Sequence, residues 1–465
     1  MKTKIGVVFV SVAFFLFSCA STENLWAPVD AAVGAGDFQG ALAAIDAGQA
    51  AEDEDERIYT EGNQISLQLD KGILKHYAGD FQASYDDLGT AERLIEEAYA
   101  KSVTAEIATY IVNDNSRDYA GEDYEDVYVN VFNALNAYHL NNGQAYALIN
   151  DLVQAGGELQ VLNEKYSEEA SGSLLKTILE YIEEALKAAG ATFSLGTVKF
   201  PESEKIEFTN SALARYLGAV FALTDGNKDM ARFQLFELQN AYKTPIYGGA
   251  AVPKALQVSG NRGDEKGPLL DIPSGKGQLN VLAFAGLSPL KEEQLKPFDY
   301  PMQAESLKTA TLKLPTLTAR PSKISGVSVA VEGGASFDLE PLEDIGAVMV
   351  DTFKGHYSAT VLKTFVRTLV KYIVADIAVQ AAVAKGTPAF LAGAAAVAAK
   401  EGLDATEGAD VRAARYLPGK AYVGAIDLDP GTYTVTVNYN GAAPVQKTVE
   451  VKAGVVSLVE AISLD

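Results

Sequence analysis

The sequence predicts a multidomain α+β protein: a degenerate α-helical repeat domain comes first, and an antiparallel β-sandwich-like domain with a helical insertion follows. Three observations predict this fold class. A chain of 465 residues exceeds the size at which a single core stops growing, about 250–300 residues. Residues 29–247 repeat a helix–turn–helix pattern, and residues 432–439 alternate strictly between polar and apolar or aromatic side chains.

The composition is that of a globular chain and limits the classes of ligand. Hydrophobic residues make up 48% of the chain and charged residues 21%. The formal net charge is -23 at pH 7. Because such a chain repels phosphate backbones, we do not expect it to bind nucleic acid.

The N-terminal segment combines positive charge, apolar residues and a cysteine. Met1–Lys4 is basic, and Ile5–Phe17 is almost wholly apolar but too short to span a bilayer comfortably. Cys19 ends this segment and resembles the lipid-modified cysteine of bacterial lipoproteins. The resemblance implies a signal peptide over 1–18, cleavage before Cys19, and a tether over 19–28 that carries several acyl chains.

Lipidation of Cys19 would have two consequences. It is the only cysteine in the chain, so we expect no disulfide, cysteine nucleophile or thiolate metal site. The residue after Cys19 is Ala20 and not aspartate. In the sorting pattern of lipoproteins, this favours the outer membrane as the location of the chain. We expect the chain to be lipid-anchored there and to face the periplasm.

Residues 29–247 are predicted to form helix pairs. A Gly or Asn ends one helix with positive φ, an Asp or Asn caps the next, and an early small residue lets the paired helices approach. This pattern is similar to tetratricopeptide pairing, but the first two turns lie farther apart than the usual repeat of about 34 residues. The turns are Gly36-Asp37-Phe38, Gly79-Asp80-Phe81, Asn141-Asn142-Gly143 and Asp225-Gly226-Asn227.

The second half begins with a Gly/Pro-rich segment, 248–277, which is predicted to be a linker. Strands are expected over 278–284 and 324–331, in a β-domain that covers 278–465. A helical insertion is expected over about 342–400. Its Ala-rich part is interrupted at Lys385 to Pro388, which favours a buried helical hairpin over a membrane-inserting one.

The C-terminal residues carry the strongest β pattern. Runs at 421–428, 432–439, 445–451 and 455–464 are separated by Asp429-Pro430-Gly431, by a loop that starts at Asn440-Gly441, and by Ala453-Gly454. We expect these four runs to form an antiparallel meander in a small immunoglobulin-like sandwich.

No catalytic or metal-binding motif is found. His76, His139 and His356 are scattered and are expected to be surface or internally satisfied histidines. No G-x-S-x-G elbow or complete phosphate loop is present, so we expect neither an enzyme nor a cofactor. The many Asp and Glu residues leave a carboxylate pair for glycan cleavage open.

Three groups are candidate binding residues, each with a structural alternative. Glu122, Asp123 and Tyr124 are expected to begin a helix, with acidic residues in its first turn. A basic stripe at four-residue spacing is expected to be a solvated face that could also meet an acidic partner. An Asp–Arg pair before the last strands is expected to brace the helical insertion against the β-domain. The stripe is Lys363, Arg367 and Lys371, and the pair is Asp410 and Arg412.

Short motifs along nearly the whole mature chain resemble a family of uncharacterised bacterial outer-membrane lipoproteins with tetratricopeptide-like helices. Its members are sometimes encoded near activators of penicillin-binding proteins. The family has no established activity, so the resemblance implies location and architecture. The motifs are Cys19, Tyr77 to Phe81, Gly121 to Glu125, Asn133 to Tyr138, Gly286 to Lys291, Lys371-Tyr372, Asp410 to Pro418 and Asp429 to Tyr433.

These observations predict a lipid-anchored scaffold of the cell envelope that binds a protein partner through its helical repeats. The alternative is a protein that binds or modifies peptidoglycan with carboxylates in a cleft between the two lobes. The membrane contact would run through the lipid on Cys19 in either case.

Overall fold

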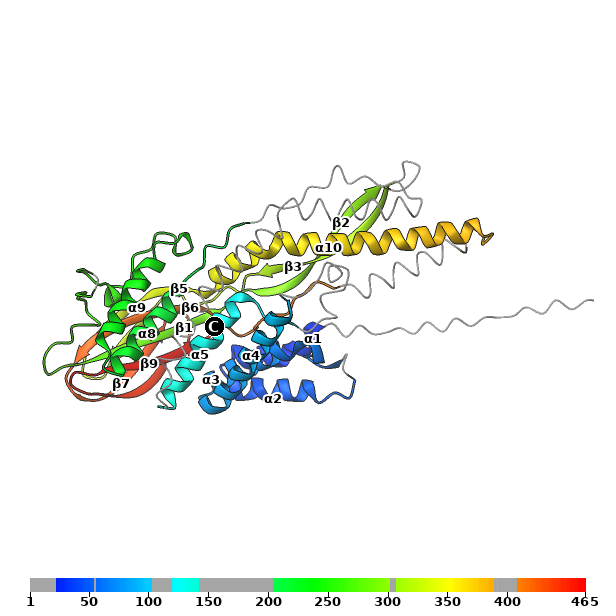
Figure 1. Cartoon of the computed structure of the whole chain (residues 1–465). Coiled ribbons are helices and arrows are strands. Elements are labelled where there is room, and N and C mark those ends of the chain that lie inside the picture. Colours follow the sequence, from blue (N-terminus) through cyan, green and yellow to red (C-terminus); the bar gives the residue numbers. More distant parts are fainter. Residues whose placement is uncertain are drawn as a thin grey trace, which may run out of the picture.

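The computed structural model describes residues 22–53, 56–102, 119–141, 204–261, 263–301, 307–388, 391 and 408–465. Cys19 and the predicted signal peptide lie outside them. The described residues form a mixed α+β structure in which helices cover the outer face of a large rolled sheet (Figure 1). No helix in this part of the chain is both long enough and apolar enough to cross a membrane.

The helices are α1 (Thr22–Gly34), α2 (Phe38–Gln49), α3 (Gln64–Tyr77), α4 (Phe81–Ser102), α5 (Asp123–His139), α8 (Ala212–Thr224), α9 (Lys228–Ala241) and α10 (Ile345–Ala384). Short 3-10 turns are η2 (Glu61–Asn63), η5 (Pro245–Tyr247) and η6 (Lys254–Leu256). The strands are β1 (Gly277–Leu287), β2 (Leu290–Pro301), β3 (Leu307–Thr318), β4 (Val327–Val331), β5 (Ser336–Asp344), β6 (Pro418–Leu428), β7 (Gly431–Tyr439), β8 (Val445–Val451) and β9 (Val456–Ser463).

The helix hairpins are closed by the turns that the sequence predicts. Gly36, Gly79 and Gly226 have φ values of 71°, 80° and 74°, in the left-handed region that favours glycine. The next residue caps the following helix: Asp37 Oδ1, for example, accepts a hydrogen bond of 2.8 Å from the backbone N–H three residues on. The hairpins α1–α2, α3–α4 and α8–α9 are thereby confirmed. The fourth predicted turn begins at Asn141 (φ 52°) and continues into residues outside the described ranges.

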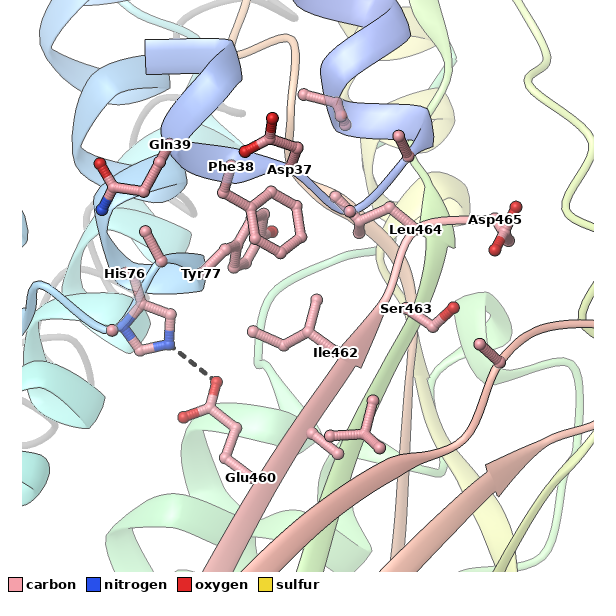
Figure 2. A pocket seen from close by; sticks show the side chains of 18 of the residues that line it. Asp37, Phe38, Gln39, His76, Tyr77, Glu460, Ile462, Ser463, Leu464 and Asp465 are labelled. Carbon is pink, nitrogen blue, oxygen red and sulfur yellow. Dashed lines mark hydrogen bonds and ion pairs between the residues drawn. The ribbon is translucent and has the colours of Figure 1, made fainter. Parts of the chain in front are cut away.

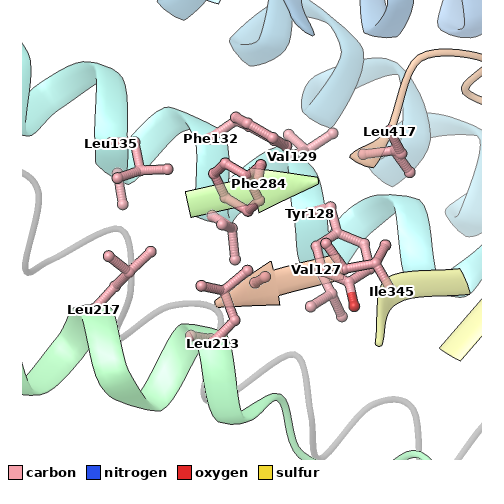
Figure 3. Close-up of a cluster of buried hydrophobic side chains, with 14 of the residues drawn as sticks. Val127, Tyr128, Val129, Phe132, Leu135, Leu213, Leu217, Phe284, Ile345 and Leu417 are labelled. Atoms are coloured by element: carbon pink, nitrogen blue, oxygen red, sulfur yellow. The ribbon is translucent and has the colours of Figure 1, made fainter. Parts of the chain in front are cut away.

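A tetratricopeptide-like stack is not confirmed, because the sheet becomes the packing partner of the later helices. α5 lies between α3–α4 and the sheet, and the ring of its Phe132 is 5.5 Å from the ring of Phe284 on β1. α8 packs against α5, β5 and β9. Figure 3 shows Phe132 and Leu135 of α5 and Leu213 and Leu217 of α8 around Phe284.

The seven-stranded sheet has the order β8-β7-β4-β5-β6-β1-β9. All neighbours are antiparallel except β1 and β9, which are parallel. The predicted C-terminal meander is therefore wrong beyond the β7–β8 hairpin, since β6 lies between β5 and β1, and β9 lies beside β1. The reason is burial: Leu458 and Val459 of β9 face different cores, and a strand that is apolar on both faces suits a parallel position covered on both sides.

The sheet rolls up instead of forming two stacked sheets, so the predicted antiparallel sandwich is corrected to one mixed sheet. Its two end strands return toward each other, and the Ser457 hydroxyl on β9 donates a hydrogen bond of 3.3 Å to the Glu450 carbonyl on β8. Side chains such as Val281, Val329 and Val437 fill the interior of the roll. Its outer face shares a second core with the helices.

Two further segments belong to the fold: α10 with the β2–β3 hairpin, and the Gly/Pro-rich segment before β1. In the described part of the predicted insertion, α10 follows β5 and runs beside the β2–β3 hairpin in Figure 1, with the rings of Phe298 and Phe365 5.0 Å apart. The predicted second half of the helical hairpin, beyond Pro388, lies almost wholly outside the described residues. The sequence did not predict strands over 290–318, since charged residues interrupt the alternation there. In the Gly/Pro-rich segment, Leu256 and Leu269 are buried in the core shared by helices and sheet.

Candidate functional site

A cavity of about 540 Å³ lies where the turns of α1–α2 and α3–α4 meet the end strands β8 and β9 (Figure 2). Its helical wall carries Phe38 and Tyr77, whose ring centroids are 5.3 Å apart. Its sheet wall carries Val445 at the start of β8, and Ile462 and Leu464 at the end of β9. Two helix turns and two strands from opposite ends of the chain therefore line one space.

Glu460 of β9 lies in the wall of this cavity and binds histidines from two helices. Its Oε1 is 2.8 Å from Nε2 of His76 on α3, and its Oε2 is 2.8 Å from Nε2 of His139 on α5. Phe81 stacks on the His139 ring, with centroids 4.2 Å apart. The side chains of His76 and Glu460 are 0% and 4% exposed, so their ion pair is shielded from water.

The hydrogen-bond network around His76 requires a proton on both ring nitrogens. The Ser84 hydroxyl donates to the Gly72 carbonyl at 2.7 Å and therefore accepts from Nδ2 of Asn136 at 2.8 Å. Asn136 consequently turns its Oδ1 to Nδ1 of His76 at 2.7 Å, and this nitrogen must donate. Since Nε2 faces the Glu460 carboxylate, His76 is an imidazolium cation.

The shifts in pKa agree with this charge assignment. Burial alone would lower the pKa of His76, but Glu460 and Asn136 raise it above its ordinary value. Burial would raise the pKa of Glu460, and the two histidines hold it well below its usual range. The charge pair fixes β9 against α3 and α5. Within the described ranges, no group of three or more His, Cys, Asp or Glu side chains is arranged to hold a metal ion.

An extended segment, residues 408–417, runs between the helices and the sheet beside the cavity, and we call it the strap. Asp70 of α3 accepts hydrogen bonds from the backbone N–H of Arg415 at 2.7 Å and of Tyr416 at 3.3 Å. The Tyr77 hydroxyl in the cavity wall donates to the Tyr416 carbonyl at 3.0 Å. The strap therefore holds one wall of the cavity in place.

A second buried carboxylate, Glu125 of α5, also holds the strap. It accepts a 2.5 Å hydrogen bond from the N–H of Ala414 and a 2.8 Å hydrogen bond from the Tyr119 hydroxyl. It also accepts a 2.8 Å bond from the backbone N–H of Glu122, which closes a capping box at the start of α5. The helix start and the strap are thus fixed by the same side chain.

Asp410 and Arg412 lie in the strap and form a bidentate pair. Nε and Nη2 of Arg412 are each 2.8 Å from an oxygen of Asp410. The guanidinium lies 5.1 Å from the Tyr119 ring centroid and donates a 3.4 Å hydrogen bond to the Gly62 carbonyl. The pair therefore braces the strap against the helical part of the chain, which is a structural role.

The candidate residues at the start of α5 are paired with the second half of the chain. Glu122 lies 2.5 Å from the Lys291 ammonium of β2, and Asp123 lies 3.0 Å from Nε2 of His356 on α10. Tyr124 is buried in the core shared by helices and sheet. None of the three lines the cavity that contains Glu460.

None of the three residues of the basic stripe on α10 lines the cavity. Arg367 is 1% exposed, and Lys363 and Lys371 are half-buried. All three make interactions in the structure. Because Arg367 is buried, the basic stripe is not the fully solvated face that the sequence predicts. At this residue the stripe takes part in the packing of α10.

The sequence did not bring His76, His139 and Glu460 together, because they belong to three separate elements. One signal points to the site: Glu460 is the only charged residue in the apolar run 455–464. A carboxylate in a strand buried on both faces needs a cationic partner, and the chain has few histidines to offer.

We expect the midpoint of thermal unfolding to fall as the pH rises from about 5 to about 8. Burial raises the pKa of Asp70 to about 6 and that of Glu125 to about 8, so the folded state binds these protons more tightly than the unfolded state. This contribution is greatest below the ordinary carboxyl pKa and is lost as the pH rises through the raised values. The raised pKa of His76 acts in the same direction.

The matched variant is Asp70→Asn, whose amide does not titrate. Calorimetric scans at several pH values should show a smaller fall in the midpoint for Asp70→Asn than for the parent chain. A midpoint that rises over this range would contradict the assignment of Asp70 and Glu125. Glu460 of the folded chain stays ionised at every pH of this series, because the two histidines hold its pKa below the tested range.

Comparison of the chain with protein-family models, with curated proteins and with solved structures finds no match.

Proposed function

We propose that this chain is a scaffold of the bacterial cell envelope that binds a protein partner through its helix hairpins. The lipid on Cys19 would anchor it to the outer membrane on the periplasmic side. The observation that carries this proposal is the cavity at which the turns of α1–α2 and α3–α4 meet β8 and β9. Its helical wall is built from the repeated turn motif, and tetratricopeptide-like proteins likewise present helix pairs to a partner.

The chemistry of the walls favours binding over catalysis. Phe38 and Tyr77 offer apolar and aromatic surface, and the strap fixes Tyr77 through its hydroxyl. The buried carboxylate of the cavity, Glu460, is already engaged on both oxygens by histidines. This engagement weakens the alternative of a peptidoglycan-modifying site, which would need a carboxylate free to act on its substrate.

The proposal predicts that a partner is cross-linked from the rim of the cavity and not from a distant surface. A photoreactive amino acid placed at Gln39, an exposed residue of the cavity lining, should give a discrete cross-linked species in intact cells. The matched control is Asp229, whose side chain is 90% exposed at the start of α9. Mass spectrometry identifies the species, and the same pattern from both positions would contradict the proposal.

The membrane anchor is tested separately. Cells grown with a labelled fatty acid should transfer the label to the parent chain and not to a Cys19→Ser variant. Equal labelling of both chains would place the lipid elsewhere.

A further inference from the structure

We propose that the occupant of this cavity is an extended peptide that adds as a strand between β8 and β9. This inference rests on the proposed function, and it names the kind of partner segment that the site takes. The ligand would be a linear segment of a few residues, held by main-chain hydrogen bonds, with an apolar side chain at every second position.

The topology of the sheet leaves a place for one more strand. Among the residues that the structure describes, β8 pairs only with β7, and β9 pairs only with β1. The two end strands are close at their connecting turn, where the Val455 N–H donates to the Lys452 carbonyl at 3.1 Å. At their other ends, residues 443–445 and 447 on one side and 460–465 on the other line the cavity. The roll is therefore closed at the turn and opens toward the helices.

The backbone of β9 has hydrogen-bonding groups that face this opening. The Val455 carbonyl accepts a hydrogen bond from Gln278 of β1, whereas the Leu458 N–H points the other way and donates to the Tyr138 hydroxyl at 3.1 Å. Because the direction alternates with a period of two residues, Glu460 and Ile462 also turn their N–H and C=O groups away from β1.

The backbone of β8 shows the same alternation. The Glu450 carbonyl faces β9 and accepts from Ser457. Thr434 of β7 lies opposite Thr448 of β8. The Thr434 carbonyl accepts a hydrogen bond from the Glu332 N–H, on the side of β7 that faces away from β8. Thr434 and Thr448 are therefore not a hydrogen-bonded pair. Thr448 and, two residues earlier, Gln446 therefore direct their main-chain groups away from β7. Within the described ranges, the main-chain groups of Gln446 and Thr448 therefore have no partner on this side of β8, and those of Glu460 and Ile462 have none on this side of β9.

The side chains around the cavity suit an extended peptide with alternating apolar residues. Toward the core shared by helices and sheet lie Phe38 and Tyr77 of the helical wall and Ile462 of β9, as Figure 2 shows. On the side of the roll interior lie Val445 and Ala461. A strand in this gap would direct successive side chains to these two apolar surfaces in turn. A volume of about 540 Å³ is within the range of small-ligand sites and therefore leaves room for a few peptide residues.

The test uses the full-length chain in detergent micelles and a phage-displayed library of random linear dodecapeptides. A selected peptide is synthesised with an N-methyl group at each position in turn. Strand addition predicts that methylation at every second position weakens binding by about tenfold or more, and that the intervening positions change it by about twofold or less. Hydrogen exchange should slow at Gln446, Thr448, Glu460 or Ile462 when the peptide binds.

A pair of variants isolates the main chain of β8. Gln446→Pro removes an N–H that the β7 ladder does not use, whereas Gln446→Ala keeps the N–H and removes only the exposed side chain. We expect Gln446→Pro to weaken binding by about tenfold and Gln446→Ala to leave it within about twofold. If Gln446→Pro does not fold, the methylation series and the exchange data decide.

The outcomes separate this inference from the proposed function. A partner that is cross-linked from Gln39, together with selected peptides that show no two-residue period and no slowed exchange on β8 or β9, would overturn strand addition alone. A three-to-four-residue period would indicate a helical ligand and would overturn it as well. No cross-link and no selected peptide would overturn both proposals.

Discussion

Glu460→Leu is expected to lower the free energy of unfolding by about 3–5 kcal/mol, because it removes one partner of a buried ion pair. The substitution leaves His76 without a counter-ion in a site where its side chain is 0% exposed. His139 also loses the acceptor of its Nε2, although its side chain is 23% exposed and water can replace that bond. The measurement is urea unfolding followed by the fluorescence of Trp26, the only tryptophan in the chain.

Two further variants make this expectation specific. Glu450→Leu on β8 replaces a carboxylate whose side chain is 63% exposed and should change the free energy of unfolding by about 0.5 kcal/mol or less. The double variant His76→Leu with Glu460→Leu removes both charges and should be more stable than Glu460→Leu alone. A double variant that is less stable than this single variant by the full cost of His76→Leu would contradict the charge pair.

The local structure of the helices could be predicted because it depends on neighbouring residues. Gly36, Gly79 and Gly226 end helices, and the Asp or Asn that follows caps the next helix, as the sequence indicates. The regular stack could not be predicted in this way, since it depends on which surface each hairpin covers. The outer face of the sheet, which includes Phe284 of β1, packs against α5 and α8, so these helices do not continue such a stack.

The strand order depended on long-range burial. Strict alternation located β7 at Gly431–Tyr439 and its hairpin with β8, but the pairing of β9 with β1 joins residues far apart in the chain. The same limit applies to the cavity. Phe38, Tyr77 and Glu460 come from three elements, and only the unusual carboxylate in an apolar strand marks the site in the sequence.

Glu343→Ala is expected to cost about 3–5 kcal/mol, because several buried donors lose one acceptor together. The carboxylate lies at the end of β5 and accepts hydrogen bonds of 2.8 Å from the Tyr128 hydroxyl and 2.9 Å from the Tyr247 hydroxyl. The Ser211 hydroxyl lies 2.9 Å from both oxygens, and the Leu213 N–H donates at 3.2 Å. These donors come from α5, α8 and its N-cap, and η5, so one side chain ties three segments to the sheet.

Two variants separate the loss of charge from the loss of the acceptor. Glu343→Gln can turn its carbonyl oxygen to the Leu213 N–H and its NH2 group to the Tyr128 and Ser211 hydroxyls, which can accept. It therefore removes the charge and one acceptor position, and we expect a loss between those of Glu343→Ala and a surface control. The control is Glu340→Ala on the same strand, which loses one exposed bond to the Lys254 N–H and should cost about 1 kcal/mol or less. Because Glu343 joins helices to the sheet, far-ultraviolet circular dichroism and Trp26 fluorescence should report the same lowered midpoint in urea. Separate midpoints would mean that the helical part and the sheet unfold independently of this contact. Equal losses of stability for Glu343→Ala and Glu340→Ala would mean that the buried hydrogen bonds of Glu343 contribute no more than the exposed bond of Glu340.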